Sequence, residues 1–252
     1  VHAQRGEPEI QALQTLRHVI GRTDWDRETV LEINPKLTYH FCNETLRKPF
    51  YEGQWSYEAC EKHSIFASSC VYPIKGFHLL LEAMPEVLRQ YPDARINVCG
   101  RSFLQSGLRR NGYEKYLAGL AKKYSLTDKI TCLGSLSAGQ MKESYLKANV
   151  FVLPSTMENS PNSLGEAMLL GLPCVAARTG GIPDMAEDGT SALFFEKGDV
   201  HGLAGCIIRI FRNEELAREL SEGARDRALR NHDGNENYRR MMEIYHEILG
   251  TV

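Results

Sequence analysis

One lysine and two glutamates have the residue types and positions to hold an anion that also carries hydroxyl groups. Lys75 stands before Gly76 in the run C-V-Y-P-I-K-G-F, and Glu158 and Glu166 lie in the run T-M-E-N-S-P-N-S-L-G-E-A-M. The lysine supplies a positive charge for a phosphate, and the carboxylates accept hydrogen bonds from hydroxyl groups. The combination is typical of a site for a phosphorylated, hydroxyl-rich ligand.

The second run also predicts that a helix begins near Ser163. The first N–H groups of a helix have no partner within it, so we expect those of Ser163, Leu164 and Gly165 to be free to bind phosphate. Gly165 has no side chain to keep a phosphate away. Glu166, inside the helix, would reach the hydroxyls of a ribose, and Glu158, on the preceding loop, would reach a second polar group. A nucleoside diphosphate that carries a sugar would use all of these groups.

Further glycines follow two other predicted strands. Gly180 and Gly181, in the run T-G-G-I-P-D, suit a turn with positive φ, and Pro183 suits the first turn of a helix. Gly134 ends another apolar run. For each glycine there are two interpretations, close approach of the backbone to the same ligand and an ordinary turn.

Each charged group also has a purely structural interpretation. Ser163 and Glu166 fit a helix capping box, worth about 1 kcal/mol of stability. Lys75 fits a solvated lysine before a helix, and Glu158 fits an exposed acid on a loop. The functional interpretation is favoured because all of them fall at one predicted crevice.

The elements that must position these residues alternate between strands and helices from residue 63 onward. Six apolar runs predict buried strands, over residues 63–69, 94–100, 129–134, 149–155, 173–178 and 191–196. Helical patterns lie between them, and residues 200–250 are helical with a break at 231–234. This alternation is typical of an α/β fold with a Rossmann-like parallel sheet of about six strands. In the common strand order 3-2-1-4-5-6, ligands bind between the first and fourth strands, which Lys75 and Glu158 follow.

Residues 1–60 have a different pattern. It predicts a helix over E-P-E-I-Q-A-L-Q-T-L-R, a strand over R-H-V-I-G, a helix capped by Thr23 and a strand over L-T-Y-H-F-C, whereas residues 43–60 have no clear period. We therefore expect residues 1–42 to be the C-terminal remnant of another domain and residues 43–62 to be a linker. Residues 63–252 are expected to form the ligand-binding domain, including the C-terminal helices.

The composition excludes several classes of protein. A net charge of −2 argues against a nucleic-acid-binding surface, and the apolar runs are far shorter than the roughly 20 residues of a membrane-spanning helix. Seven cysteines without close pairs predict neither a disulfide framework nor a zinc site, and Cys99, Cys132 and Cys174 lie in apolar runs typical of a core. We therefore expect no metal and a reducing, cytoplasmic setting.

Several motifs resemble the donor domain of glycosyltransferase family 4. They are P-x-K-G-F-H-L-L-L-E-A, L-G-S-L and P-S-x-x-E-N-S-P-N-S-L-G-E-A-M-L-L-G-L-P-C-V-A-A-R-T-G-G-I-P-D, and the resemblance extends over roughly residues 63–250. The most specific part is the E-x7-E pattern from Glu158 to Glu166. The family has the GT-B fold, with two Rossmann-like domains facing a cleft, and its members are retaining enzymes that need no metal.

The resemblance implies a retaining hexosyltransferase that takes a UDP-, GDP- or ADP-sugar, with this chain as its donor-binding half and by itself incomplete. Glu166 would bind the donor ribose, and Glu158, catalytic together with Lys75, would meet the donor sugar near its reacting end. Lys75 and the turn from Ser163 to Gly165 would carry the diphosphate. The acceptor-side domain would precede this region, and any peripheral membrane contact would be made through it.

The sequence departs from the family pattern at two places. Ser68 and Ser69 replace a G-R pair after the first strand, so the phosphate site lacks a cation unless another basic residue, such as Arg101, supplies it. Residues 159–162 replace glycines between the two motif glutamates, and Asn162 among them would contact the donor and change the choice of sugar.

Three alternatives are open from the sequence. Asp24-Trp25-Asp26 matches the D-x-D metal–nucleotide motif of another glycosyltransferase fold, although acids in the first turn of a capped helix explain it as well. A sugar-nucleotide epimerase of related architecture is a second enzyme, against which the E-x7-E pattern counts. A nucleotide-sugar-binding module without turnover is the non-enzyme interpretation of the chain.

Overall fold

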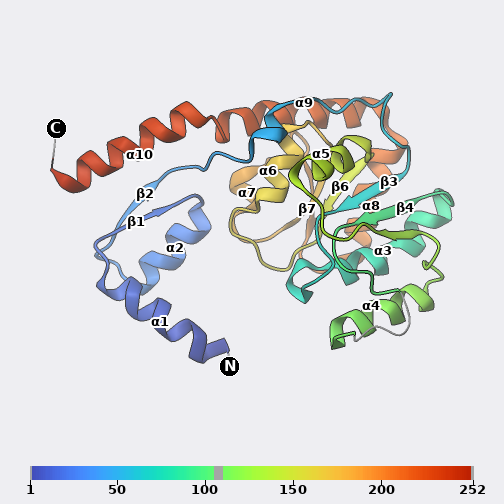
Figure 1. The fold of residues 1–252 in the computed structure, drawn as a ribbon, viewed down its shortest axis with the longest axis horizontal. Coiled ribbons are helices and arrows are strands. Elements are labelled where there is room, and N and C mark those ends of the chain that lie inside the picture. Colours follow the sequence, from blue (N-terminus) through green and yellow to red (C-terminus); the bar gives the residue numbers. More distant parts are fainter. Residues whose placement is uncertain (1, 105–109, 251–252) are drawn as a thin grey trace. The chain divides into compact units, whose positions relative to one another are not determined.

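The computed structural model describes residues 2–104 and 110–250, and the chain divides into two compact units (Figure 1). Unit 1 consists of residues 1–45 and 230–252, and unit 2 consists of residues 46–229. All of the residues that the sequence nominates for the ligand site lie in unit 2.

Unit 2 is built on a six-stranded parallel sheet. Its strands are β3 Ser64–Ala67, β4 Arg95–Val98, β5 Ile130–Cys132, β6 Val150–Leu153, β7 Cys174–Arg178 and β8 Leu193–Glu196. They are ordered β5-β4-β3-β6-β7-β8, which is the common order 3-2-1-4-5-6 on which the expected crevice depends. Each predicted apolar run therefore contains one strand, and the first and fourth strands, β3 and β6, are neighbours in the register Ile65 to Val150 and Phe66 to Phe151.

Helices follow the strands in turn. They are α3 Phe77–Gln90, α4 Gly112–Lys123, α5 Ala138–Lys147, α6 Asn162–Leu169, α7 Ile182–Met185, α8 Val200–Arg212 and α9 Glu214–Asn231. Asn111 and Ser137 begin α4 and α5 with capping boxes, in which a side chain at each end of the first turn satisfies a free amide. The predicted break at 231–234 separates α9 from the last helix, and a further break at Asn213 separates α8 from α9.

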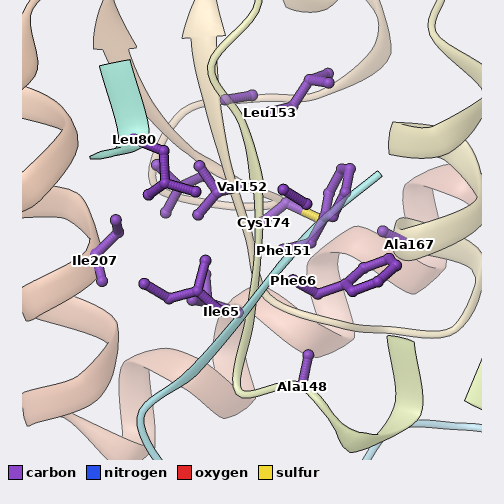
Figure 2. Close-up of a cluster of buried hydrophobic side chains, with 14 of the residues drawn as sticks. Ile65, Phe66, Leu80, Ala148, Phe151, Val152, Leu153, Ala167, Cys174 and Ile207 are labelled. Atoms are coloured by element: carbon purple, nitrogen blue, oxygen red, sulfur yellow. The ribbon is translucent and has the colours of Figure 1, made fainter. Parts of the chain in front are cut away.

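The core of unit 2 lies on both sides of the central strands, because alternate side chains of a strand point to opposite faces. Figure 2 shows Ile65 near Leu80 of α3 and Ile207 of α8, whereas Phe66 lies on the other side with Phe151. Helices α3 and α8 pack together, while α5 and α6 contact the 3-10 turn Lys48–Tyr51. The sheet is thus buried between helices, as its continuous apolar runs require.

The aperiodic segment after residue 45 is an integral part of unit 2. Phe50 is completely buried and meets Tyr145 edge-on at 5.9 Å between ring centroids. Trp55 is also buried, and its Nε1 donates a hydrogen bond to the Ala148 carbonyl at 2.8 Å. The segment has no hydrophobic periodicity because it packs on α5 and α6 through single buried side chains and not through a long helix or strand. The predicted domain boundaries after residues 42 and 62 stay predictions.

Unit 1 contains the elements expected for the N-terminal region, namely α1 His2–Thr15, β1 His18–Gly21, α2 Asp24–Ile33 and β2 Thr38–Phe41, together with the C-terminal helix α10 Gly234–Leu249. Strands β1 and β2 pair in parallel. Thr23 caps α2 as predicted, because its side chain accepts a hydrogen bond from the Asp26 amide. Helix α10 is tied to β2 by Arg240, whose Nε donates to the Phe41 carbonyl at 3.3 Å.

Candidate functional site

The loops that follow β3 and β6 meet at the carboxyl edge of the sheet. The Thr156 amide donates to the Ile74 carbonyl at 2.8 Å, which joins the two loops directly. Gly76 makes this approach possible, because a Cβ at that position would lie 1.8 Å from the Pro154 carbonyl oxygen and its φ is +67°. At the crevice predicted between the first and fourth strands, the backbones of the two loops that follow these strands are therefore in direct contact.

Lys75 and Glu158 form an ion pair at this junction, with 2.7 Å between Nζ and Oε1. Ser155 donates a second hydrogen bond to the same carboxylate oxygen, also at 2.7 Å. The Glu158 side chain is only 9 % exposed and that of Lys75 33 %. Glu158 is consequently not the exposed loop acid of the structural alternative, and the two residues predicted to be catalytic are brought together.

The third loop, after β7, holds the backbone of Glu158. The Gly181 amide donates to the Glu158 carbonyl at 3.1 Å, and a Cβ on Gly180, where φ is +52°, would lie 1.8 Å from that same oxygen. Thr179 Oγ1 donates to the Thr156 carbonyl at 3.2 Å. The two glycines thus approach the site loop itself, and their contact with a ligand stays a prediction.

Helix α6 begins one residue earlier than expected, at Asn162, after Pro161. Ser163 therefore lies inside the first turn and no side chain caps the helix, so the structural alternative of a capping box between Ser163 and Glu166 is wrong. The amides of Leu164 and Gly165 donate to the Pro161 carbonyl at 2.9 and 3.4 Å. These two amides are not the free donors that the sequence predicted, because the earlier start gives them an acceptor.

Glu166 lies on α6 and is held by Arg47, a residue that the sequence analysis missed. Arg47 Nε and Nη2 donate to the two carboxylate oxygens at 2.7 and 2.8 Å. The hydrogen bond to Glu166 is the main cause of a raised pKa for the Arg47 guanidinium. Arg47 belongs to the aperiodic segment, so neither spacing nor a neighbouring motif distinguishes it from the other basic residues.

Two other residues considered for the site have different partners in the structure. Arg101, a candidate for the missing phosphate cation, forms a bidentate pair with Glu114 of α4, at 2.8 Å from Nη2 to each carboxylate oxygen. Gly134, where φ is +71°, exchanges backbone hydrogen bonds with Gly100 at 3.0 and 3.2 Å, and a Cβ there would meet no atom within 4 Å. Its contact with a ligand stays a prediction.

The D-x-D motif is the first turn of α2 in unit 1. Asp26 accepts hydrogen bonds from the Arg22 amide and the Tyr39 hydroxyl, and Asp24 pairs with Arg27 at 3.1 Å. These contacts confirm the structural interpretation of the two acids. Within residues 2–104 and 110–250, no group of three or more His, Cys, Asp or Glu side chains is arranged to hold a metal ion.

The cysteines are free thiols, and most of them are buried. Burial raises the pKa of Cys70 to about 12 and that of Cys99 to about 11, which makes both poor nucleophiles at neutral pH. Cys99 and Cys174 are core residues as predicted, whereas Cys132, near the sheet edge, is only half-buried.

Fold and sequence together define a class of protein. A six-stranded parallel sheet in this order, with loops meeting at its carboxyl edge, is a Rossmann-like domain, the type of domain from which GT-B glycosyltransferases are built. The family model of the glycosyl transferases group 1 matches residues 58–227, so the chain belongs to that family.

Individual relatives agree with this membership. The chain is similar to a sulfoquinovosyl transferase of Arabidopsis thaliana, 29% identical over 60% of this chain and 28% of that protein. It is also similar to an N-acetyl-alpha-D-glucosaminyl L-malate synthase of Bacillus anthracis, 29% identical over 52% of this chain and 34% of that protein. The chain therefore spans about a third of these curated relatives.

Solved structures share the fold at low sequence identity. A sucrose-phosphate synthase of Thermosynechococcus elongatus superposes with a TM-score of 0.83 and 21% identity, covering 99% of this chain and 63% of that one. HepE of Anabaena, solved in complex with UDP-glucose, has a TM-score of 0.79 and 18% identity over 92% of this chain and 64% of that one. No helix within the described part of the chain is long and apolar enough to cross a membrane.

Proposed function

We propose that this chain is the donor-binding half of a retaining hexosyltransferase that uses a nucleoside-diphosphate sugar. The observation that carries the proposal is the pairing of Lys75 with Glu158 where the loops after β3 and β6 meet. This is the switch point at which open parallel sheets bind their ligands. A relative of the same fold, HepE, has been solved with UDP-glucose, which supports a UDP-sugar among the candidate donors.

Donor binding requires an exchange of partners at this pair. Without ligand, Glu158 neutralises Lys75 at 2.7 Å. A diphosphate carries more negative charge than one carboxylate, so Lys75 would move to the diphosphate and leave Glu158 to accept hydrogen bonds from the donor sugar. Ser155, already bonded to Glu158, would keep that carboxylate in place. The exchange makes the sugar contact depend on the presence of the diphosphate.

The remaining groups have supporting roles in this proposal. The positive end of α6, from Asn162 to Gly165, faces the diphosphate, and Glu166 accepts the ribose hydroxyls. The glycines at 134, 180 and 181 let the backbone approach the donor. Lys75 and the helix end stabilise the departing diphosphate without a metal, while the acceptor attacks on the same face of the sugar. Glu158 positions the sugar and is not a nucleophile.

The proposal extends to the rest of the enzyme. The acceptor site would belong to a further domain, because the chain spans only about a third of its curated relatives. We propose that the enzyme works in the cytoplasm, where its free and mostly buried cysteines stay reduced. An alternative, favoured by the same short span, is that the chain binds the donor without transferring its sugar.

Calorimetry against UDP, GDP and ADP and their glucose conjugates tests the proposal. We expect one nucleotide series to bind, and Lys75→Ala to weaken that binding about tenfold or more, as for the loss of a hydrogen bond to a charged group. Sugar release in the same samples separates an enzyme from a binding module. Failure of all three series to bind would show that the unit is not a donor site.

A further inference from the structure

The Arg47–Glu166 pair is built more tightly than a surface ion pair. Both carboxylate oxygens accept from one planar guanidinium, at 2.7 and 2.8 Å, which is the bidentate geometry that arginine favours. The Glu166 side chain is 3 % exposed, whereas that of Arg47 is 50 % exposed. Arg47 is therefore the member of the pair that faces solvent, and a ligand that approaches Glu166 meets its guanidinium as well.

Both ends of this pair are fixed by the core. The guanidinium of Arg47 lies 4.8 Å from the ring centroid of Phe50, which is completely buried. Phe50 packs against Tyr145, whose hydroxyl donates to the Ser163 carbonyl at 3.0 Å. Ser163 lies on α6, one turn before Glu166. The same small set of residues thus positions the cation and the helix that carries the carboxylate.

A buried carboxylate in this position needs a cation. Without Arg47, the Glu166 carboxylate would be desolvated and without this partner, which would favour turning the side chain away. With Arg47 in place, each carboxylate oxygen uses one lone pair for the ion pair and keeps another for a further hydrogen bond. Two acceptor atoms side by side match the two neighbouring hydroxyls of a ribose.

We propose that Arg47 is a positioning residue that holds the Glu166 carboxylate in the orientation that accepts the 2′- and 3′-hydroxyls of the donor ribose. Arg47 thereby sets the preference of the site for ribonucleotides over 2′-deoxyribonucleotides. The inference rests on the proposed function, because it assigns a role inside the same donor site.

The test measures how each variant discriminates between two ligands that differ by one hydroxyl. Binding of UDP, GDP and ADP and of their 2′-deoxy counterparts is measured by calorimetry for the wild type and for Arg47→Ala and Arg47→Lys. We expect the wild type to prefer the ribonucleotide about tenfold or more, which is the size of a hydrogen bond to a charged acceptor. Both variants should reduce this ratio to about threefold or less, because lysine keeps the charge but not the two-pronged geometry.

Arg101→Ala is the matched control. Arg101 also forms a bidentate pair, it is 55 % exposed, and its partner Glu114 is 9 % exposed. Its removal should cost comparable stability in a thermal melt and leave the ribose preference unchanged. Arg47→Gln, which keeps a hydrogen-bond donor of moderate size, provides a second variant if Arg47→Ala does not fold.

The outcomes separate the inference from the proposed function. If the wild type binds none of the nucleotides, the donor-site proposal fails and the role of Arg47 with it. If the wild type binds them and the Arg47 variants keep the full ribose preference, Arg47 is only a structural residue and the inference is wrong. Tighter nucleotide binding by Arg47→Ala with an unchanged ribose preference would also overturn the inference, because Arg47 would then only block access to Glu166.

Discussion

Lys75 and Glu158 neutralise each other across 83 residues of sequence, at 2.7 Å between Nζ and Oε1. In the proposed donor site, a donor would have to separate these two side chains, of which Glu158 is largely shielded from solvent. The free energy of the ion pair would then be subtracted from the affinity for a bare diphosphate. It would be recovered only when a sugar gives Glu158 new hydrogen bonds. At the scale of single residues, the proposal therefore implies that the pair discriminates between a nucleotide sugar and a bare nucleotide.

Replacing Glu158 with Gln tests that idea. The variant frees Lys75 of its counter-charge, so we expect a bare nucleoside diphosphate to bind as well as or better than it binds the wild type. The nucleotide sugar should lose its advantage over the bare nucleotide by about tenfold, because a neutral amide is a weaker acceptor than a carboxylate. Calorimetry with both ligands gives the ratio directly.

Glu196→Gln is a suitable control for this substitution. Glu196 is 72 % exposed, it pairs with Arg178 at 3.1 Å, and it ends β8. The Glu196→Gln variant should leave the ratio of the two affinities unchanged. If the ratio is also unchanged in Glu158→Gln, Glu158 does not contact the donor sugar.

The positions of the candidate site residues were more predictable from the sequence than the partners of these residues were. Lys75, Glu158 and Glu166 stand in motifs whose place after the first and fourth strands follows from the hydrophobic pattern. Arg47 was not predictable, because a bidentate contact across 119 residues has no periodic or local signature. The pairing of Arg101 with Glu114 escaped prediction for a related reason. Glu114 already forms the capping box of α4 with Asn111, and its additional contact with Arg101 has no local signature.

At the scale of elements, glycines decide how closely the three site loops approach one another. Gly76 and Gly180 each lie against a backbone carbonyl at a distance that no Cβ would allow. The sequence identified Gly180 as part of a turn, but it does not show that the turn packs on Glu158. The start of α6 was misplaced by one residue because Pro161, an unusual residue directly before a helix, stands where no side chain signals a cap.

Gly180→Ala should disrupt the site loop more than an ordinary glycine replacement. Adding a Cβ strains the positive φ and drives the Glu158 carbonyl away, so we expect a loss of about 2–4 kcal/mol of stability and weaker binding of the nucleotide sugar. Thermal melts and calorimetry measure the two effects.

Gly189→Ala separates strain from collision. Gly189 has a φ of +78°, but a Cβ there meets no atom within 4 Å. We expect it to cost about 1 kcal/mol from backbone strain alone and to leave donor binding intact. Equal effects of the two replacements would mean that the contact with Glu158 has no part in shaping the loop.

At the scale of the whole molecule, the hydrophobic core is unevenly divided. In unit 2 the apolar residues of six strands and their helices form one buried cluster. In the described part of unit 1, six residues are buried, and three of them are polar: Thr23, Leu37, His40, Cys42, His232 and Ile244. A two-stranded sheet with so little apolar burial is marginally stable on its own.

Hydrogen exchange should show this difference. We expect the amides of β1 and β2 to exchange at least about a hundredfold faster than those of β3 and β6 after correction for intrinsic rates, because unit 1 opens without global unfolding. Site-resolved exchange at neutral pH measures both sets in one sample. Equal protection in the two sheets would show that the chain unfolds as one cooperative body.

The fold as a whole was largely predictable, since short buried strands that alternate with amphipathic helices leave few possible arrangements. The six strands, the capped helix at Thr23 and the break near residue 232 all follow from local patterns, whereas the strand order is the common one of this architecture. The packing of residues 46–60 could not be predicted from local patterns. Phe50 and Trp55 are isolated buried residues, and their burial depends on α5 and α6, which lie far away in the sequence.

The strand order also determines when the site can first exist during synthesis. Strands β3, β4 and β5 are neighbours and are all made before β6, so half of the sheet can pair while the rest of the chain is still on the ribosome. Lys75 and Arg47 emerge early, 83 and 119 residues ahead of the carboxylates that they contact. A nascent chain therefore carries both cations before it has either carboxylate, and the proposed donor site can form only after α6 has been completed.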